Sequence, residues 1–198
     1  AKHGFKKENS LEIPLHAFNR NYKDANHKPE IMLALSPFKA LCGFRPFNQI
    51  YDLFALFPLK KLQEIKNSFT NSKNYVLLYK NLLEIPEEEA KEICTQAVII
   101  AQSLVEENKD FYTKQAALFI LHLAQSYPFD LGILAPLYLN CLEFNEGQAI
   151  FLPAGIIHAY IQGTGLELMA NSDNVMRGGL TSKYIDKTEL LSILDNKT

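Results

Sequence analysis

Side chains suited to metal and proton chemistry gather in one late stretch of the sequence, residues 146–183. An apolar run ends at a corner that contains Pro153 and Gly155, and a second short run then begins with His158. Proline and glycine are the residues that most often mark such a corner. Imidazole serves both as a metal ligand and as a proton carrier. The stretch therefore predicts two short strands joined by a turn, with an imidazole on the second strand.

The residues after His158 predict a β-hairpin, because Gln162-Gly163-Thr164-Gly165 is a turn signal between two alternating runs. Side chains alternate across a strand, and opposed residues share a face. With Gly163 and Thr164 as the loop, one face of the hairpin holds His158, Tyr160, Glu167 and Met169. The other face is apolar. The polar face is expected to line a site, although a solvent-facing sheet edge would show the same alternation.

A second candidate group lies near the beginning of the chain. Pro29 biases Lys28 toward extended geometry, and Glu30 begins a largely apolar strand, so Lys28 and Glu30 should point the same way. A carboxylate at the mouth of a buried strand is costly unless it meets a cation or a metal. From these residues alone, Glu30 is either such a ligand or a strand-end charge left in water.

Three segments resemble the type I phosphomannose isomerases (mannose-6-phosphate isomerases). They are Asn-Tyr-Lys-Asp-Ala-Asn-His-Lys-Pro-Glu at 21–30, Phe-Lys-Ala-Leu-Cys-Gly-Phe at 38–44, and the run from Met169 to Tyr184. The resemblance extends along the whole chain. The spacing G-x5-P-x-G-x2-H, which starts at Gly147, resembles the second motif of the cupin barrels. Gln162 stands where that motif has Asn.

The resemblance implies a zinc-dependent isomerase that interconverts mannose 6-phosphate and fructose 6-phosphate through a cis-enediol. In this family one zinc ion is held by Gln, His, Glu and His, and the last two match Glu30 and His158. Oxygen and imidazole nitrogen are suitable zinc ligands. The upstream Gln-x-His motif of the family does not occur in this sequence. Two ligands alone would make a poor zinc site.

The family pattern also assigns roles toward the substrate. It places an essential arginine at Arg177, whose cationic fork suits a phosphate or an enediolate oxygen. Lys183 and Lys28 match family positions that could contact phosphate or sugar hydroxyls. Tyr160 is a candidate substrate-binding residue on the expected hairpin. Because Arg177 precedes two glycines, a turn position is the alternative for it.

The proton-transferring base stays open among four residues that match motif positions. They are His27, Lys28, Glu167 and Asp173. The base must lie within hydrogen-bond reach of the proton that moves. The expected hairpin favours Glu167, while Asp173 is equally suited to a turn or a cap, since Asn-Ser-Asp-Asn is itself turn chemistry.

The elements that position these residues predict an α+β fold: a cupin-like antiparallel β-barrel (jelly roll) interrupted by an all-helical insertion. Strand-like alternation gives way to helical spacing after Pro46, with helices expected over residues 48–57, after Pro86, and over 111–125. Strand texture returns at 133–143. The expected domains are 1–47, the first part of the catalytic barrel; 48–127, the helical insertion; and 128–198, the second part with a short helix near 188–194.

Length, composition and charge indicate which size of core and which classes of partner to expect. A 198-residue chain with 47% hydrophobic residues can bury a sizeable core, and a net charge of −2 gives no reason to expect nucleic acid. No run of membrane-spanning length and no signal peptide occur, so we expect a cytoplasmic protein with no membrane partner. The cysteines, Cys42, Cys94 and Cys141, are expected to be reduced core thiols.

Two other functions stay open beside the isomerase of carbohydrate metabolism. The first is a cupin-type sugar-binding or regulatory protein that does not turn its sugar over, because barrel folds carry many functions. The second is an inactive truncated piece, since the chain begins at Ala1 in a polar stretch and is expected to be a fragment lacking both ends. The expected partner is a phosphosugar substrate. The sequence does not determine the oligomeric state.

Overall fold

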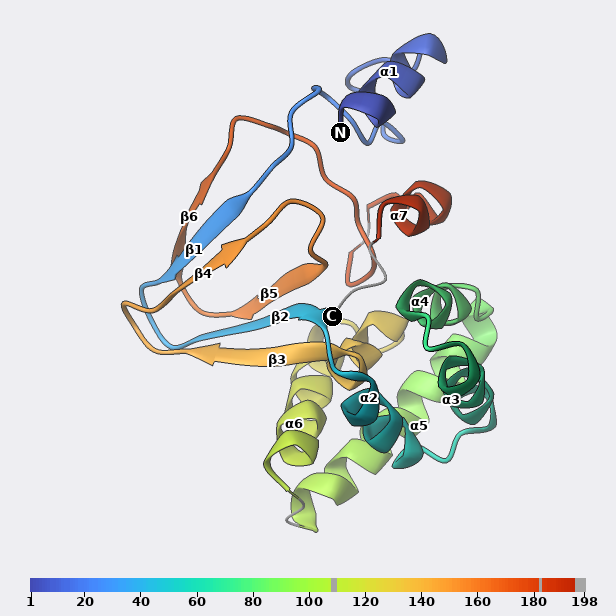
Figure 1. Ribbon diagram of the computed structural model, residues 1–198. Coiled ribbons are helices and arrows are strands. Elements are labelled where there is room, and N and C mark those ends of the chain that lie inside the picture. Colours follow the sequence, from blue (N-terminus) through green and yellow to red (C-terminus); the bar gives the residue numbers. More distant parts are fainter. Residues whose placement is uncertain (108–109, 182, 195–198) are drawn as a thin grey trace. The chain divides into compact units, whose positions relative to one another are not determined.

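The structure is a computed structural model that describes residues 1–107, 110–181 and 183–194 (Figure 1). In chain order its elements are α1 (Lys2–Ser10), β1 (Glu30–Ala34), β2 (Phe38–Phe44), α2 (Phe47–Ala55), α3 (Lys60–Ser72), α4 (Tyr75–Leu83), α5 (Glu87–Glu106), α6 (Phe111–Ser126), the 3-10 helix η1 (Leu131–Leu137), β3 (Leu139–Phe144), β4 (Ala149–Leu152), β5 (His158–Gln162), β6 (Gly165–Met169) and α7 (Lys187–Ile193). In the described part of the chain the strands form two three-stranded sheets, ordered β4-β1-β6 and β3-β2-β5.

The described residues fall into two compact units. The first unit comprises Ala1–Lys39, Glu143–Ile156 and Gln162–Leu194, and the second comprises Ala40–Leu142 and Ile157–Ile161. The first unit therefore contains the sheet β4-β1-β6 together with α1 and α7. The second unit contains helices α2 to α6, η1 and most of the sheet β3-β2-β5.

Strand β1 is the centre of the first unit's sheet and pairs antiparallel with both β4 and β6 (Figure 1). Its side chains alternate as expected for a strand, since Glu30, Met32 and Ala34 are buried while Ile31 is 42% exposed. Phe151 and Leu168, the partners of Ile31 on the two neighbouring strands, are 61% and 63% exposed. One face of β1 is therefore buried, and the opposite face of the sheet presents a row of exposed apolar side chains.

The expected hairpin between β5 and β6 is wrong, because these consecutive strands belong to different sheets. Strand β6 pairs with β1, and β5 pairs with β2. The turn residues mark a strand switch: the Thr164 carbonyl accepts from Leu35 N at 2.9 Å, and its amide donates to Ser36 Oγ at 2.9 Å. Gly163, at φ +115°, lies against Phe38, an approach that only glycine allows. The local turn signal was correct, but it does not specify the pairing partner.

Hydrogen bonds to buried charges organise the loop that follows α1 in the first unit. The Glu8 carboxylate accepts from the backbone amides of Asn21 and Tyr22 at 3.0 and 2.8 Å. It also lies 3.0 Å from Arg20 Nε. Arg20 in turn donates to the carbonyls of Tyr22 and Ile13, both at 2.6 Å. Glu8 and Arg20 are thus paired with each other and hydrogen-bonded to the backbone. These bonds fix the segment that leads to residues 23–30.

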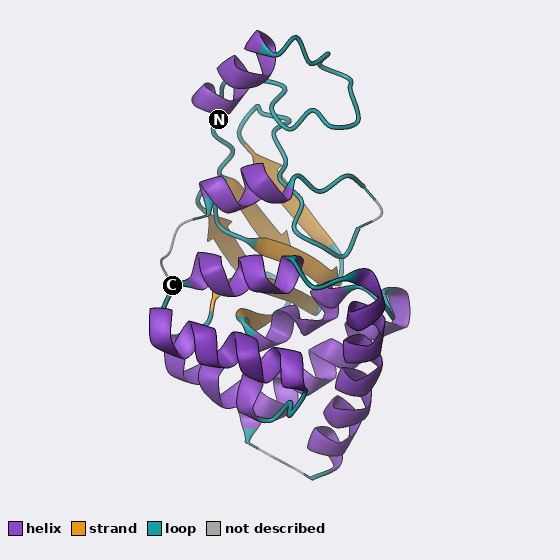
Figure 2. Cartoon of the chain, turned by 90° about the vertical axis from the view of Figure 1, so that its right-hand side faces the viewer, coloured by secondary structure: helices purple, strands orange, loops and turns teal. Residues whose placement is uncertain are grey.

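The expected helices over 48–57, after Pro86 and over 111–125 are confirmed as α2, α5 and α6, which lie within one helical body (Figure 2). Pro86 is the N-cap of α5, and Asp110 caps α6 by accepting from Tyr112 N and Thr113 N. The helix near 188–194 is confirmed as α7, which Asp186 caps.

The strand expected over residues 133–143 is wrong in its first part, because Leu131–Leu137 forms the 3-10 helix η1. Asp130 causes the difference: its side chain accepts from Gly132 N at 2.7 Å and starts a helical turn. Residues 133–137 of η1 are buried without strand pairing, and β3 begins at Leu139. A short buried apolar run does not distinguish these two conformations by periodicity.

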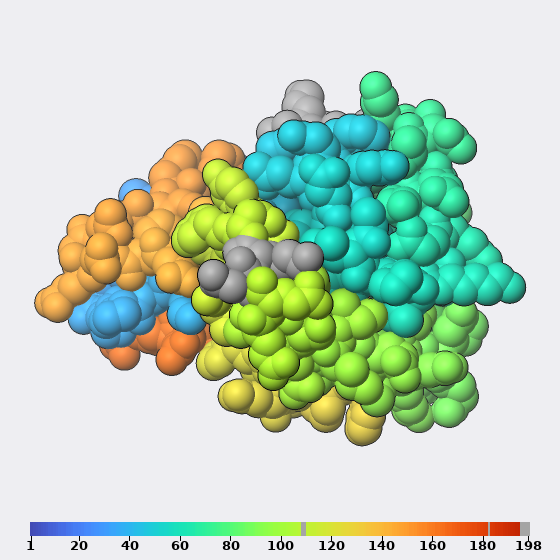
Figure 3. All heavy atoms as spheres, turned by 90° about the horizontal axis from the view of Figure 1, so that it is seen from below, coloured from blue at the N-terminus to red at the C-terminus, as the bar shows by residue number. Residues whose placement is uncertain are grey.

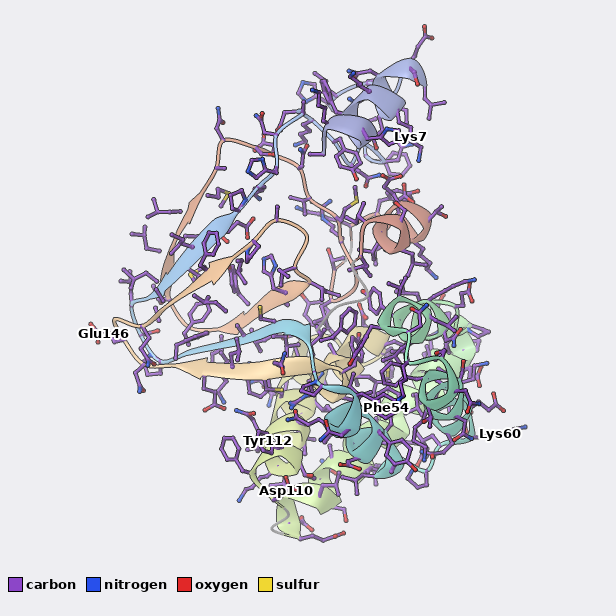
Figure 4. The ribbon with its side chains drawn as sticks, in the orientation of Figure 1. Lys7, Phe54, Lys60, Asp110, Tyr112 and Glu146 are labelled. Carbon is purple, nitrogen blue, oxygen red and sulfur yellow. The ribbon has the colours of Figure 1, made fainter. Side chains whose placement is uncertain are left out.

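Apolar and aromatic packing holds the second unit together. Phe54, Leu62 and Ile120 are at most 1% exposed. Figure 4 shows Phe54 directed inward among the helices and Lys60 directed outward, and Figure 3 shows the atoms of α2, α3, α5 and α6 as one continuous surface. Burial at this density is the main favourable contribution to the stability of such a bundle.

Arg45 is a charged residue within this apolar core, and it is only 2% exposed. Its guanidinium donates to the Pro136 carbonyl at 3.0 Å, to Gln49 Oε1 at 3.2 Å and to Cys141 Sγ at 3.1 Å. Arg45 therefore ties β3, η1 and α2 together through satisfied hydrogen bonds.

All three cysteines are free, as expected. Burial raises the pKa of the Cys94 thiol to about 12, so Cys94 stays protonated at neutral pH. In the part of the chain that the structure describes, no helix has the length and apolar character needed to cross a bilayer. The division into residues 1–47, 48–127 and 128–198 stays a prediction, and residues 108–109, 182 and 195–198 lie outside the described residues.

Replacing Gly163 with alanine is expected to destabilise the chain by about 2 to 5 kcal/mol. An added Cβ would lie 2.7 Å from the Pro37 carbonyl oxygen and 2.6 Å from the Phe38 ring, in addition to the strain of positive φ. Gly147→Ala is the matched control: Gly147 also has positive φ, +82°, but its Cβ would meet nothing within 4 Å. Urea unfolding of both variants measures the difference, and equal losses would contradict the close approach.

Candidate functional site

Glu30 and Lys28 point the same way at the start of β1, as the alternation predicted, and they form an ion pair. Lys28 Nζ lies 3.2 Å from Glu30 Oε1, and the two side chains are 17% and 10% exposed. Removal of a carboxylate from water is costly, and the ammonium group offsets part of that cost. The structure thus places a negative group and a compensating cation together at the first residue of the central strand.

The strand pairing brings Glu167 to the same face as Glu30. Glu30 lies opposite Met169, and Met32 lies opposite Glu167. Since opposed residues share a face and residues two apart share a face, all four side chains project from one side of the sheet. Glu30 and Glu167 are therefore diagonal neighbours across β1 and β6. Glu167 reaches this position through β1 and not through the hairpin that was expected to place it beside His158.

His158 and Tyr160 both lie on β5 and are half-buried. Their ring centroids are 5.5 Å apart, which confirms that they share one face of the strand. Gly43 N donates to the Ile157 carbonyl at 2.8 Å, so β2 fixes the beginning of this strand. His158 and Tyr160 belong to the second unit, and Glu30 belongs to the first.

Arg177 and Lys183 lie in the segment between β6 and α7, in the first unit. Arg177 is half-buried, and the backbone that follows it has unusual conformations, with φ +150° at Gly179 and +53° at Leu180. The side chain of Lys183 is exposed, and its amide donates to Thr181 Oγ1 at 3.1 Å. Positive φ is strained for leucine but not for glycine, and such strain at Leu180 is common where a loop presents a functional group.

The two remaining candidates for the base, His27 and Asp173, are both exposed. Asp173 N donates to Asp24 Oδ2 at 2.9 Å, a hydrogen bond to a loop 149 residues away in the sequence. His27 lies directly before Lys28, in the loop that leads to β1.

Sequence reasoning missed three residues that join the two motif loops: Asp24, Ser172 and Asn174. Ser172 Oγ donates to Asp24 Oδ1 at 2.9 Å, and Asn174 Nδ2 donates to the same oxygen at 3.1 Å. The signal available in the sequence was the concentration of Asn, Asp and Ser in both segments, which marks side-chain to backbone bonding but not the partner.

The hydrogen bonds lower the pKa of Asp24. Burial acts to raise this pKa, but the backbone bonds from Asp173 and Asn26 and the side-chain bonds from Ser172 and Asn174 outweigh burial. A carboxyl whose pKa is lower in the folded chain stabilises the fold above its unfolded pKa of about 4. That contribution is lost as the pH falls through the lowered value and Asp24 becomes protonated.

Among the residues that the structure describes, no group of three or more His, Cys, Asp and Glu side chains is arranged to hold a metal ion. Glu30 and His158 nevertheless have the chemistry of zinc ligands, a carboxylate oxygen and an imidazole nitrogen. Further ligands would have to come from outside this group.

Residues 3–47 match the family described as phosphomannose isomerase type I, catalytic domain. The chain is 41% identical over 192 residues to mannose-6-phosphate isomerase of Escherichia coli K12, and 36% identical over 212 residues to a probable mannose-6-phosphate isomerase of Echinococcus multilocularis. These alignments cover 96% and 95% of this chain.

Solved structures give the same result. A mannose 6-phosphate isomerase from Salmonella typhimurium, bound to its substrate fructose 6-phosphate and to zinc, superimposes with a TM-score of 0.80 at 37% identity and covers 99% of this chain. A zinc-bound mannose 6-phosphate isomerase also gives a TM-score of 0.80. Sequence and fold thus both relate the chain to sugar-phosphate isomerases. Within that class, the relationship is to the type I phosphomannose isomerases.

The chain spans about half the length of the relatives that it matches: 46% of the Escherichia coli protein and 48% of the Salmonella typhimurium structure. The similarity covers both compact units of the chain.

The Lys28–Glu30 pair is expected to show a coupling free energy of about 1 to 3 kcal/mol in a double-mutant cycle, because both side chains are largely removed from water. Lys28→Met, Glu30→Gln and the double variant would be compared by urea unfolding. The control cycle uses Lys80 and Glu84, an exposed pair 3.7 Å apart at the C-terminal end of α4, for which about 0.3 to 0.5 kcal/mol is expected. Equal coupling in the two cycles would show that the Lys28–Glu30 pair is no more than a surface pair.

Proposed function

We propose that this chain is part of a type I phosphomannose isomerase and that the whole protein interconverts mannose 6-phosphate and fructose 6-phosphate. The observation that carries the proposal is the alignment with mannose-6-phosphate isomerases over 96% of the chain at 41% identity. It is supported by a fold match to a solved relative that holds fructose 6-phosphate and zinc. The motif residues Glu30, His158 and Arg177 are all present in the sequence.

Zinc is the proposed cofactor, with Glu30 and His158 as two of its ligands. The support is the donor chemistry of these two groups and the zinc bound in the related structures. The remaining ligands would come from polypeptide that this chain does not contain. When bound, zinc supplies a Lewis acid that polarises the sugar carbonyl.

The residues of this chain would bind the phosphosugar and move one proton between C2 and C1. Arg177 would hold a phosphate or an enediolate oxygen with its charged fork, and Lys183, Lys28 and Tyr160 would contact phosphate or hydroxyl groups. Glu167 is our first choice for the base, since the pairing of β1 with β6 puts it on the same face as Glu30. His27 and Asp173 are more exposed, and the amine of Lys28 lies against Glu30.

The fold of the whole catalytic domain is proposed to be a cupin-like barrel with a helical insertion. The strand order supports this proposal, because successive strands alternate between the two sheets at β1–β2, β3–β4 and β5–β6. The apolar side chains on the open face of β4-β1-β6 also favour coverage by further polypeptide. The cytoplasm is the proposed location, as the sequence predicted.

An assay of the longer protein that contains this chain tests the function directly. With zinc present we expect conversion of mannose 6-phosphate to fructose 6-phosphate, whereas a cupin-type sugar binder would bind the sugar without turnover. The 198-residue chain alone is expected to be inactive, because two ligands do not complete a zinc site.

Arg177→Ala in the longer protein is expected to lower kcat about 100- to 1000-fold, because it removes a fixed positive charge from the developing negative charge of the reaction. Arg177→Lys should recover only part of the rate, since lysine keeps the charge but loses the fork. Lys91→Ala, on the exposed side of α5, is the control. A near-normal rate in Arg177→Ala, with an unchanged circular dichroism spectrum, would remove Arg177 from its proposed role.

Glu30→Gln and His158→Asn are each expected to weaken zinc binding by at least about tenfold, because loss of a direct ligand should cost no less than loss of a supporting group. Metal content after dialysis against a weak chelator, measured by mass spectrometry, gives the result independently of activity. His16→Asn, on an exposed loop, is the control. Zinc retained equally in all three variants would show that the ligands lie elsewhere.

A further inference from the structure

The pairing of β1 with β6 continues beyond the two strands into the loop that precedes β1 and the loop that follows β6. The regular pairs run from Ala34 and Gly165 to Glu30 and Met169. The next contact in the same direction is Ala170 N donating to the Pro29 carbonyl at 3.1 Å. The side chain of Asn26 then donates to the Asn171 carbonyl at 2.9 Å. Two loops distant in sequence are thus held side by side for several residues past the sheet.

Asp24 and Asn174 close the end of this pairing by binding each other's loops. Asp24 Oδ2 accepts from Asp173 N at 2.9 Å, and Asp24 Oδ1 accepts from Ser172 Oγ and Asn174 Nδ2. In return, Asn174 Oδ1 accepts from the amides of Lys23 and Asp24 at 2.8 and 3.2 Å. Asn174 Nδ2 also donates to the carbonyls of Asp24 and Asn26 at 3.0 and 2.9 Å.

These bonds differ from ordinary turn capping, because each side chain serves the opposite loop. Asp24 and Ser172 are 148 residues apart in sequence. An Asx turn satisfies its own backbone, as Asp24 also does with Asn26 N at 2.8 Å. The reciprocal bonds of Asp24 and Asn174 add nothing to the local turn of either loop. They fix one loop relative to the other. We call Asp24 and Asn174, with the hydrogen bonds that each makes to the opposite loop, the loop clasp.

The loop clasp lies within a few residues, along the sequence, of four first-unit residues to which a role in chemistry is proposed. Asp24 precedes His27, Lys28 and Glu30 in one loop, and Asn174 precedes Arg177 in the other. We propose that Asp24 and Asn174 are positioning residues that hold the Lys28–Glu30 pair and the Arg177 segment in the arrangement a phosphosugar requires. This inference rests on the proposed isomerase function. Small misplacements of binding groups reduce rates strongly, by up to about 100-fold for about 1 Å.

Two single-atom substitutions break the loop clasp without changing the volume of either side chain. Asp24→Asn places an amide NH2 where Asp173 N needs an acceptor, so that two donors face each other. Asn174→Asp removes all three bonds that Asn174 Nδ2 donates and places a second carboxylate against Asp24. The control is Asp110→Asn, which replaces a carboxylate with similar bonds at the start of α6, in the other unit (Figure 4).

Amide hydrogen exchange on the 198-residue chain tests the loop clasp without reference to activity. Asp24→Asn and Asn174→Asp should speed exchange at least tenfold at Asp173, Lys23 and Asp24, while α5 and α6 exchange as in the unsubstituted chain. Asp110→Asn should leave these loop amides unchanged and should speed exchange only at the start of α6. Unchanged exchange in the loops of both clasp variants would overturn the proposal.

Kinetics of the longer protein test the positioning role. At a temperature where all variants are folded, Asp24→Asn and Asn174→Asp should lower kcat/KM by about 10- to 100-fold with zinc content unchanged, and Asp110→Asn should stay within twofold of the unsubstituted enzyme. Near-normal kcat/KM in both clasp variants would overturn the positioning role. An unsubstituted protein that bound zinc without turning over mannose 6-phosphate would instead refute the proposed function. The exchange result would then decide whether the two loops are clasped.

Discussion

The antiparallel pairing of β1 with β6 is the interaction on which the candidate site depends. It sets Glu30 opposite Met169 and Met32 opposite Glu167, and it leads directly into the two motif loops. Register matters here because a slip of one residue turns every side chain of a strand to the other face. Such a slip would replace Glu30 on the buried face with Ile31, and no charged group would face the interior at this point.

Local patterns explain how much of the fold was accessible from the sequence. Helices α5 and α6 were predictable because their periodicity, the proline before α5 and the caps all lie within a few residues. The partner of β6 was not, because a turn signal reports that the chain changes direction and carries no information about which distant strand lies beside it. The close approach of Gly163 to Phe38 is visible only in three dimensions. At η1, one aspartate converted an apparent strand into a helical turn.

The same distinction between local and distant contacts decides which features of the candidate site could be predicted from the sequence. The shared direction of Lys28 and Glu30 followed from strand alternation and proline geometry, both of which act between neighbours. Asp24 and Asn174 look like turn residues in sequence, because their composition does not reveal the loop to which they bond. The roles proposed for Arg177, Lys183 and His158 depend on the family resemblance, since no spacing rule links residues so far apart in the chain.

The long separation between β1 and its partners has a consequence for how the protein folds. Local contacts form early, whereas pairing between distant segments must first overcome the entropy of closing a long loop. In the chain, helices α2 to α6 lie between β1 and both of its partner strands. These helices can therefore pack together before β1 pairs with β4 and β6. During synthesis on the ribosome, β1 would emerge long before β6. The central strand is thus a transiently unpaired edge, and early capture of β1 by another chain is the misfolding route that this topology favours.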